Sequence, residues 1–338
     1  MANMKDVARQ AKVSIATVSA VVNNSAYVSE ELSVRVTAAI QELGYRPNAL
    51  ARSLKKNRSR ILSLMVKDVT NPFYPEMISG AELAASEAGY GLILYTTGDD
   101  MRREQSGLRS MLEYRVDGML LAIVEEKNRS ILDVVRKEGI PVVLINRRPE
   151  DYEGIYVGVD NEAAGRIATE HLISLGHKEI AFIGAKSDVM TSRNREKGYR
   201  RAMAENGLPV PERLIRYCEY SDEKAYRAYQ KLIAGGKIPG AIFSANDLMS
   251  FGAVRALLEA GLRIPEDVAI VGCDDIAFSG SFRVPLTTVH IPKYDIGKAG
   301  AELLIRMVES RSSVGLERIL LRPRLVVRQS CGASRPQT

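Results

Sequence analysis

From residue 61 onward, short apolar runs alternate with longer segments in which apolar residues recur every three to four positions. The apolar runs are residues 61–66, 92–95, 118–123, 142–145, 180–183, 241–243 and 268–271, and the amphipathic segments include residues 74–88, 162–175 and 248–260. This alternation predicts parallel strands joined by helical crossovers, an α/β fold in which helices flank the sheets. Two such sheets, with a return through residues 287–290 before a last helix at 295–309, would form two lobes around a cleft.

The first sixty residues carry the whole net charge of the chain. They hold ten basic and four acidic residues, a net charge of +6, and the 47 basic and 41 acidic residues of the full chain also leave +6. Basic charge gathered in one short segment is typical of a surface that neutralises phosphates. We therefore expect this segment to bind nucleic acid.

Two short helices joined by a tight turn are predicted within residues 4–24. Their apolar faces consist of Val7, Ala8 and Ala11 in the first helix and Val18, Val21 and Val22 in the second. Ser14 suits the N-cap of the second helix, and the small residues at the corner allow a steep crossing. A third helix is expected after Ser29, which would cap it, and Gly44 would end it. The pattern is a helix-turn-helix, and the alternative is a helical module that binds another protein.

The second helix of a helix-turn-helix enters the major groove by its N-terminal residues. Ile15, Ala16 and Ala20 would then face the base edges, where their apolar side chains can contact thymine methyl groups but form no bidentate hydrogen bond. Ser14 and Thr17 are suited to phosphate contacts or to capping. Base recognition by this head is therefore expected to be unusually apolar.

Residues 46–54, with the sequence RPNALARSL, have a helical pattern about two turns long. A helix this short is not stable alone in water, so we expect it to order on DNA. Leu54 could act as an apolar wedge in the minor groove, with Arg52 and Lys55 near phosphates and Asn48 in the same DNA-binding set. The charged residues 55–60 would form a linker.

The strings KDVARQAKVSIATVS and YRPNALARSL, and their spacing, resemble the lactose-repressor and galactose-repressor (LacI/GalR) family of bacterial transcription regulators. The resemblance covers nearly the whole chain and implies a homodimer that inserts paired leucines, here Leu54, at the centre of a pseudo-palindromic DNA operator. Ala20 departs from the family pattern, which often has Arg or another long polar residue there. The operator sequence therefore does not follow from that of better-known members.

The family's core looks like a periplasmic sugar-binding protein without its export signal. The resemblance implies a DNA-binding head at residues 1–46, a hinge helix and linker at 47–60, and an effector-binding and dimerisation core at 61–338. Within that core, the N-lobe would comprise about residues 61–160 and 291–322, and the C-lobe about residues 161–290 and 323–331. We expect a small-molecule effector, a sugar or sugar derivative, to bind between the lobes.

Polar clusters follow the apolar runs, at the strand ends where open parallel sheets bind ligands. By resemblance, the residues of the effector pocket are Phe73, Tyr74, Asn146, Arg147, Asp160, Thr191, Arg195, Tyr220, Asn246, Asp247 and Asp274. A carboxylate and a guanidinium can each bind two adjacent hydroxyls, and an aromatic face can cover a sugar ring.

Structural alternatives exist for several of these residues. Asp160 and Asn246 could instead cap helices, and the two aromatic residues, Phe73 and Tyr74, could be core residues under a loop. Arg147 and Arg148 could instead form surface ion pairs with Glu150 and Asp151, in which case they would say nothing about the charge of a ligand.

Other classes of protein lack support in the sequence. The three cysteines and three histidines are too scattered for a disulfide framework or a metal site, and no Walker loop or Gly-x-Ser-x-Gly motif is present, so we expect no enzyme activity and no cofactor. No long apolar run and no secretory signal are found, which favours a cytoplasmic protein without membrane contact.

The sequence therefore predicts a homodimeric transcription regulator, a repressor, that binds a double-stranded DNA operator and is controlled by a carbohydrate effector. One alternative is a family regulator that responds to a protein corepressor. Another is a solute-binding protein or an enzyme with an incidental helical head. The missing export signal and catalytic motifs argue against the latter two.

Overall fold

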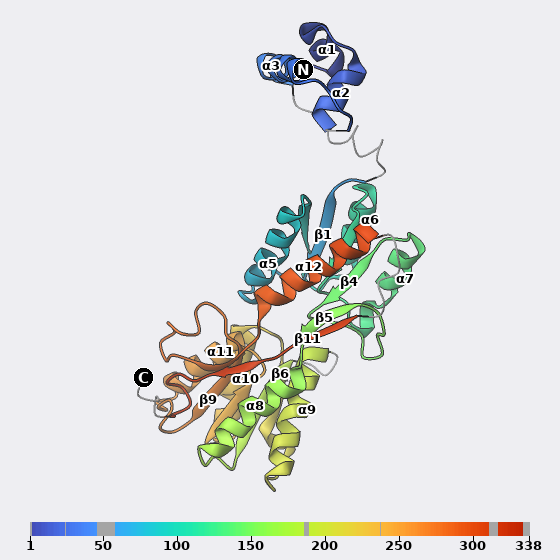
Figure 1. The fold of residues 1–338 in the computed structure, drawn as a ribbon. Helices are drawn as coiled ribbons and strands as arrows, with labels where there is room; N and C mark the ends of the chain where they lie inside the picture. Colours follow the sequence, from blue (N-terminus) through green and yellow to red (C-terminus); the bar gives the residue numbers. More distant parts are fainter. Residues whose placement is uncertain are drawn as a thin grey trace. The chain divides into compact units, whose positions relative to one another are not determined.

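The computed structural model describes residues 2–23, 25–45, 58–185, 189–236, 238–310 and 317–333. The chain divides into two units, Met1–Arg60 and Ile61–Thr338. Figure 1 draws the described part of the first unit in blue, and the second unit from the blue of β1 through green and yellow to red. Asn48, Arg52, Leu54 and Lys55, the expected contacts of the hinge, lie outside the described residues.

The first unit contains the three expected helices, α1 (Met4–Ala11), α2 (Ile15–Asn23) and α3 (Glu30–Glu42). Val7, Val18 and Val36, one from each helix, are completely buried against one another. A small cluster of this kind holds the helices together because each contributes one apolar face. The helix-turn-helix predicted from the apolar pattern is therefore present.

The ends of these helices follow the predicted caps in two cases of three. The Ser14 hydroxyl accepts a hydrogen bond from the Thr17 amide at 3.0 Å, which caps α2. Gly44 follows α3 with a φ of +58°, the left-handed conformation that glycine adopts at low cost. The third cap is confirmed in position only: Ser29 occupies the N-cap position of α3, but its side chain makes no capping hydrogen bond. Ser29 and Glu30 are exposed, so water can satisfy these amides instead.

The second unit contains two six-stranded sheets. The first has the order β11-β5-β4-β3-β1-β2, and all its pairs are parallel. Its strands are β1 (Ile61–Val66), β2 (Gly91–Thr96), β3 (Gly118–Leu121), β4 (Val142–Ile145), β5 (Tyr156–Val159) and β11 (Arg318–Leu321). We call the part of the unit built on this sheet the N-lobe.

The second sheet has the order β12-β10-β9-β8-β6-β7. Its strands are β6 (Ile180–Ala185), β7 (Ile215–Cys218), β8 (Ala241–Ser244), β9 (Ala269–Asp274), β10 (Thr287–His290) and β12 (Arg324–Val326). Only the pair of β10 with β12 is antiparallel among the described strands of this sheet. We call the part built on this sheet the C-lobe. The expected α/β architecture is thus confirmed, and each of the seven apolar runs is a strand.

Helices cover both faces of each sheet. In the N-lobe they are α5 (Phe73–Glu87), α6 (Met101–Glu113), α7 (Ser130–Lys137) and α12 (Lys293–Ser310), and in the C-lobe they are α8 (Asn161–Ser174), α9 (Met190–Glu205), α10 (Asp222–Ala234) and α11 (Asp247–Glu259). On β1, Leu62 and Leu64 pack on the side of α5 and α12, whereas Met65 packs with α6 and α7. Side chains alternate along a strand, so continuous apolar strands fit a sheet that is covered on both faces.

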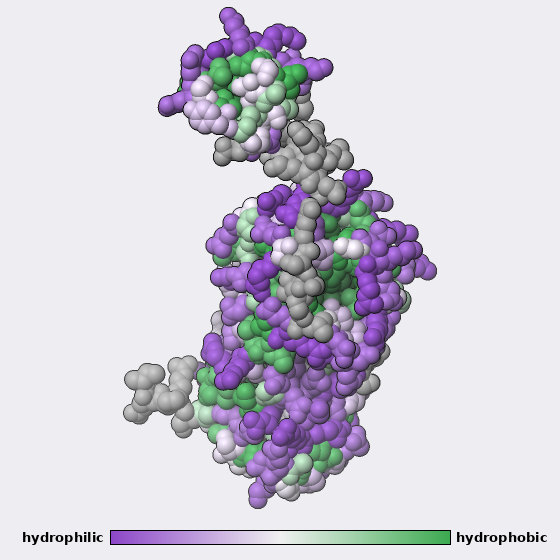
Figure 2. Space-filling view, turned by 45° about the vertical axis from the view of Figure 1, so that its right-hand side comes forward, coloured by the Kyte–Doolittle hydropathy of each residue, from purple (hydrophilic) through white to green (hydrophobic). Residues whose placement is uncertain are grey.

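None of the helices in the described part of the chain is long and apolar enough to span a bilayer. On the face that Figure 2 shows, the surface of the second unit is mostly hydrophilic, with several exposed hydrophobic patches.

Candidate functional site

The strand ends of the two lobes meet at a small polar pocket. Its lining consists of Asn71, Phe73, Tyr74, Asn146, Arg147, Thr191, Arg195, Tyr220, Asn246 and Asp274. Nine of these ten residues were expected at an effector site, and the tenth, Asn71, lies two residues before Phe73 in the same loop. The pocket takes residues from the loops after β1 and β4 in one lobe and after β6, β7, β8 and β9 in the other. Both sheets therefore present their carboxyl-terminal edges to it, as expected for open parallel sheets.

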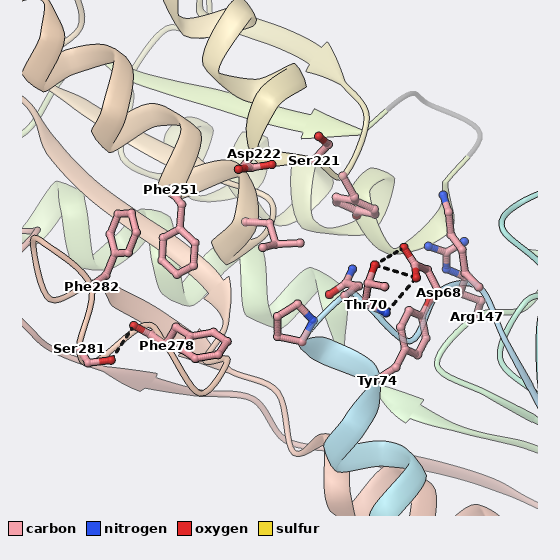
Figure 3. Close-up of a pocket in the computed structure, with 15 residues that line it drawn as sticks. Asp68, Thr70, Tyr74, Arg147, Ser221, Asp222, Phe251, Phe278, Ser281 and Phe282 are labelled. Carbon is pink, nitrogen blue, oxygen red and sulfur yellow. Dashed lines mark hydrogen bonds between the residues drawn. The ribbon is translucent and has the colours of Figure 1, made fainter.

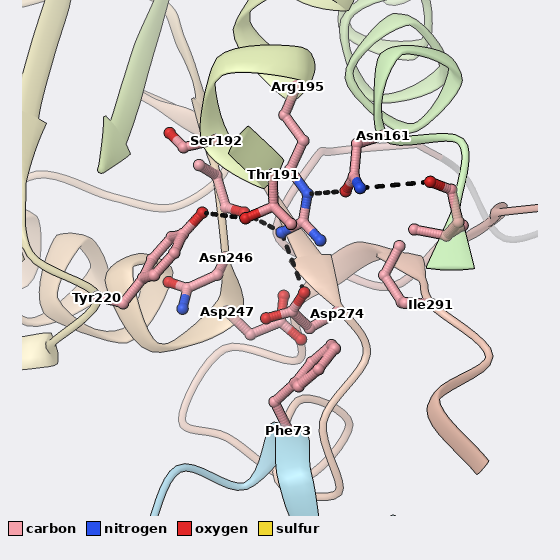
Figure 4. A network of polar contacts seen from close by, with 12 residues as sticks. Phe73, Asn161, Thr191, Ser192, Arg195, Tyr220, Asn246, Asp247, Asp274 and Ile291 are labelled. Atoms are coloured by element: carbon pink, nitrogen blue, oxygen red, sulfur yellow. Dashed lines mark hydrogen bonds and ion pairs between the residues drawn. The ribbon is translucent and has the colours of Figure 1, made fainter. Parts of the chain in front are cut away.

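Arg195 is the centre of the C-lobe side (Figure 4). Its Nε donates to the Asn161 side-chain oxygen at 2.9 Å, and its Nη1 lies 3.0 Å from a carboxylate oxygen of Asp274 and also donates to the Ala245 carbonyl. Arg195 and Asp274 are only 3% and 5% exposed. Burial raises the pKa of Asp274 to about 7, although the guanidinium of Arg195 opposes this shift.

Packing between α8 and α9 holds Arg195 in this position. Gly165 on α8 and Gly198 on α9 face the backbone of the opposite helix, at Arg195 and Glu162 respectively. A methyl group at either glycine would collide with that backbone, so only glycine permits the close approach. The two helices can therefore bring Asn161 and Arg195 into hydrogen-bonding contact.

Hydroxyl and amide groups surround this ion pair. The Thr191 and Tyr220 hydroxyls lie 3.2 Å apart, and burial raises the pKa of Tyr220, which keeps its hydroxyl neutral. The Asn246 side-chain oxygen caps α11 by accepting from the Met249 amide at 2.9 Å, which leaves its NH₂ group for the pocket. Asn246 is thus both a helix cap and a pocket residue.

Arg147 belongs to the N-lobe side of the pocket and forms a buried ion pair that the sequence analysis missed. Its Nη1 lies 3.2 Å from a carboxylate oxygen of Glu125, and both side chains are almost completely buried. Glu125 follows β3, so the rule that placed polar residues at strand ends could have found it. The alternative of surface ion pairs was wrong: Asp151 pairs with Arg129 and Glu150 with Arg193. Arg129 directly precedes α7, and Arg193 lies on α9, so both carboxylates already have partners other than Arg147 and Arg148.

Arg148 also has no surface ion pair of the expected kind. Its Nη1 donates to the backbone carbonyls of Pro149 and Glu150, and its guanidinium lies 5.3 Å from the centre of the Tyr156 ring.

The aromatic residues Phe73 and Tyr74 lie at the start of α5 with their rings edge to face, and both line the pocket. They are largely buried, yet they also present surface to the cavity.

Two expected pocket residues lie elsewhere. Asp160 is exposed and caps α8 by accepting from the Ala163 amide at 2.9 Å. Asp247 is completely buried and accepts hydrogen bonds from the Ser279 and Thr288 hydroxyls, each at 2.6 Å, and from the Ile276 amide. Asp247 thus anchors the loop after β9, which carries Asp274.

A larger groove of about 680 Å³ continues the pocket and shares Asn71, Tyr74, Arg147 and Tyr220 with it (Figure 3). Its apolar wall consists of Leu248, Phe251, Phe278 and Phe282, and its polar wall includes Lys67, Asp68 and Thr70. The Phe251 and Phe282 rings stack with their centres 4.0 Å apart, and Phe278 is 59% exposed. Among the described residues, no group of three or more His, Cys, Asp or Glu side chains is arranged to hold a metal ion.

The head unit presents part of the expected base-reading surface to solvent. Ile15 is 45% exposed and Ala16 is exposed at the start of α2, whereas Ala20 is half-buried. The Ser14 and Thr17 hydroxyls lie 2.8 Å apart, so capping already engages Ser14. Four of these five residues lie at the amino-terminal end of α2 or directly before it, and Ala20 lies about one turn further along the helix.

Arg35 on α3 ties that helix to the end of α1. Its Nη2 donates to the Ala11 carbonyl at 2.6 Å and to the Lys12 carbonyl at 3.2 Å, at the end of α1. This basic residue therefore serves the fold of the head by satisfying carbonyls that α1 leaves open.

Comparisons with known proteins agree with this architecture. Residues 3–48 match the model of bacterial regulatory proteins of the lacI family, and residues 169–331 match a periplasmic binding protein-like domain. The ribose operon repressor of Escherichia coli (strain K12) is 37% identical over 330 residues, which cover 98% of this chain and all of that protein. The HTH-type transcriptional repressor PurR of Photobacterium profundum is also 37% identical, over 98% of both chains.

Solved structures give the same result. A complex of the transcriptional regulator CelR with cellobiose has a TM-score of 0.75 at 31% identity and covers 98% of this chain and 100% of its own. A lac repressor dimer bound to operator and the anti-inducer ONPF has a TM-score of 0.89 at 25% identity, over 98% of this chain and 99% of its own. The chain therefore belongs to the lacI family of bacterial regulatory proteins and is a DNA-binding transcriptional repressor of that family.

Proposed function

We propose that a carbohydrate bound in the pocket controls the affinity of this repressor for a pseudo-palindromic operator. The observation that carries the proposal is the buried Arg195–Asp274 pair, whose atoms lie 3.0 Å apart among hydroxyl and amide groups. Such a pair offers donors and acceptors to adjacent hydroxyls of a sugar, and the Phe73 and Tyr74 rings offer apolar surface for its ring face. The cellobiose complex of CelR and the name of the ribose operon repressor support this ligand class.

The pocket can couple ligand binding to the DNA-binding head through β1. The amino-terminal end of this strand, at Ile61, continues the segment that leads from the head, and its carboxyl-terminal end leads to Phe73 and Tyr74. A ligand that contacts both lobes favours the closed arrangement over the open one by its difference in affinity for the two. Closure would then change the position of β1 and, with it, the geometry available to the two heads of a dimer.

On the DNA side, we propose that α2 enters the major groove. The exposed Ile15 and Ala16 would contact base edges with Ala20, and Ser14 and Thr17 would contact phosphates. The hinge residues Asn48, Arg52, Leu54 and Lys55 would complete the DNA contacts. The lac repressor dimer bound to operator, a fold neighbour of this chain, supports this assignment.

We also propose that the repressor is a homodimer that pairs through the aromatic wall of the groove. Phe251, Phe278 and Phe282 form an apolar surface on α11 and the loop after β9, and such a surface is typical of an interface between subunits. A second copy of this chain is the expected occupant, because a pseudo-palindromic operator requires two heads related by twofold symmetry.

The proposal is tested by isothermal titration calorimetry of the full-length protein with a panel of sugars, sugar acids, sugar phosphates and nucleobases. D-ribose and cellobiose are the first members of that panel. We expect one sugar to bind in a saturable manner, and the Arg195→Met variant to lose that binding at least a hundredfold. Operator affinity measured with and without the sugar must change by the same factor as sugar affinity with and without operator. Binding by a nucleobase and by no sugar would exclude the carbohydrate proposal.

A further inference from the structure

Only one member of the Arg147–Glu125 pair reaches the pocket. Arg147 lines both the inner pocket and the groove, whereas Glu125 lines neither of them. The Nε of Arg147 is buried and has no hydrogen-bond partner within the described chain, so a bound acceptor or a water molecule must satisfy it. Arg147 is thus placed to touch a ligand, and Glu125 can act only through Arg147.

Glu125 is held rigidly in place behind the arginine. Its amide donates to the Asn128 side-chain oxygen at 2.7 Å, and the Asn128 NH₂ group donates to Glu104 at 2.9 Å and to the Ile123 carbonyl at 3.1 Å. Glu104, Glu125 and Asn128 are each at most 2% exposed. Such a network fixes the backbone from which the Glu125 side chain extends, and burial beside Arg147 holds the carboxylate against the guanidinium.

A second cation lies near Glu125 but has a closer partner. Lys127 is 3.8 Å from Glu125, and it is 3.0 Å from Asp99, which also pairs with Lys67 at the rim. Lys127 is partly exposed, whereas Arg147 is buried. The main electrostatic effect of Glu125 therefore falls on the Arg147 guanidinium.

Each lobe presents an arginine beside a buried carboxyl group to the pocket. The N-lobe contributes Arg147 with Glu125, and the C-lobe contributes Arg195 with Asp274. A buried guanidinium without a counterion would attract an anion strongly, because few other groups there can compensate its charge. With a carboxylate 3.2 Å away, that attraction is largely cancelled, and the guanidinium can still donate hydrogen bonds.

We infer that Glu125 is a specificity-determining positioning residue, which orients Arg147 and neutralises it so that the pocket takes a neutral sugar and rejects sugar phosphates and sugar acids. This inference rests on the proposed carbohydrate function and adds the charge class of the ligand. Glu125 determines that class without touching the ligand itself. Removal of its charge, with the shape of the side chain kept, should convert the Arg147 side of the pocket into an anion site.

The test uses full-length Glu125→Gln and inorganic phosphate as the probe, followed by calorimetry and thermal unfolding. We expect the variant to bind phosphate at least tenfold more tightly than the wild type. Glu170→Gln, which removes the same charge from an exposed pair with Arg166, is the control and should resemble the wild type. Because the head can also bind phosphate, the gained binding must disappear in the double variant Glu125→Gln with Arg147→Met.

Several outcomes would overturn the inference. One is a folded Glu125→Gln protein that binds phosphate no better than the wild type, and another is gained binding that survives loss of Arg147. If Glu125→Gln does not fold, the test uses the wild type and the Glu125→Asp variant, which keeps the charge. Both proteins should bind D-ribose or D-glucose at least tenfold more tightly than D-ribose 5-phosphate or D-glucuronate. Equal or reversed preference contradicts the inference. If no sugar binds the wild type but Glu125→Gln gains Arg147-dependent phosphate binding, the carbohydrate proposal fails and the charge role of Glu125 stands.

Discussion

At the scale of single residues, the pocket depends on two aspartates that resemble each other in sequence and differ in role. Asp247 and Asp274 both lie at strand ends and both are buried. Asp274 faces the cavity beside Arg195, whereas Asp247 accepts two hydrogen bonds from the loop that follows β9 and a third from Thr288 on β10. One is therefore available to a ligand, and the other is committed to holding that loop.

The raised pKa of Asp274 predicts that effector affinity depends on pH. With a pKa of about 7, Asp274 is mostly protonated at pH 6 and mostly ionised at pH 8, and only the carboxylate accepts two ligand hydroxyls. Affinity should therefore rise about tenfold from pH 6 to pH 8, with release of a proton on binding. Calorimetry in buffers of different ionisation enthalpy measures both effects. The Asp274→Asn variant should bind weakly with no such pH dependence, and a flat profile in the wild type would rule out this role.

The Asp247→Ala variant should mainly lose folding stability, because Asp247 holds buried groups in place and does not line the pocket. It would leave the Ser279 and Thr288 hydroxyls and the Ile276 amide without their acceptor in a completely buried site. We expect the free energy of unfolding to fall by about 3 kcal/mol, measured by urea denaturation. Asp160→Ala is the matched control, because that exposed cap should cost about 1 kcal/mol. Equal losses in the two variants would contradict the anchoring role.

At the scale of helices and strands, close contact between α8 and α9 decides where Arg195 lies. The apolar period of residues 162–175 predicted α8, but no local pattern indicated that Gly165 and Gly198 would face each other's helix backbones. A glycine within a helical pattern only weakens the helix prediction. Its use as a contact surface becomes visible when the two helices are packed together.

The Gly198→Ala variant should therefore impair both packing and binding. Its new methyl group would meet the backbone of Glu162 and Arg166, so α9 must move away from α8 and carry Arg195 with it. We expect a loss of about 1–3 kcal/mol in the free energy of unfolding, together with a weaker effector affinity in calorimetry. The neighbouring exposed residue serves as control: Lys197→Ala should change stability by less than about 0.5 kcal/mol. Unchanged effector affinity in a folded Gly198→Ala protein would show that this contact does not position Arg195.

At the scale of the whole molecule, the chain passes between the two lobes three times. It crosses between β5 and α8, between β10 and α12, and between β11 and β12. Each lobe is therefore built from separate parts of the chain, and the pocket lies where both contribute side chains. An arrangement of this kind suits hinge closure around a ligand, because short connections can change while both sheets stay intact.

Dimerisation is tested by replacing an aromatic residue of the groove wall. Phe282→Asp would put a charge into the proposed interface, so we expect a monomer in analytical ultracentrifugation and at least a hundredfold loss of operator affinity. Effector binding to the monomer should persist, since Phe282 lines the groove but not the inner pocket. Leu175→Asp, at an exposed leucine beyond the end of α8, should remain dimeric. A dimeric Phe282→Asp protein would place the interface elsewhere.

The sequence by itself determined the elements whose signals are local. Alternating apolar runs predicted seven strands, the spacing of alanine and valine residues predicted α1 and α2, and the Ser14 hydroxyl caps α2 as expected. Each of these signals depends on residues a few positions apart. The short edge strands β7, β11 and β12 are mixed in composition, and no such signal predicted them. Neighbouring strands and helices decide whether such segments join a sheet.

Only the tertiary structure decided which polar groups meet. Glu125, Arg147, Arg195 and Asp274 come from four separate strand ends, yet they form two buried ion pairs at one cleft. The strand-end rule could nominate these positions, but it could not separate Asp274 from Asp247 or pair Arg147 with Glu125 instead of the nearby Glu150. Those choices depend on side-chain packing across long sequence separations. Local pattern therefore specified the scaffold, and long-range packing specified the chemistry of the pocket.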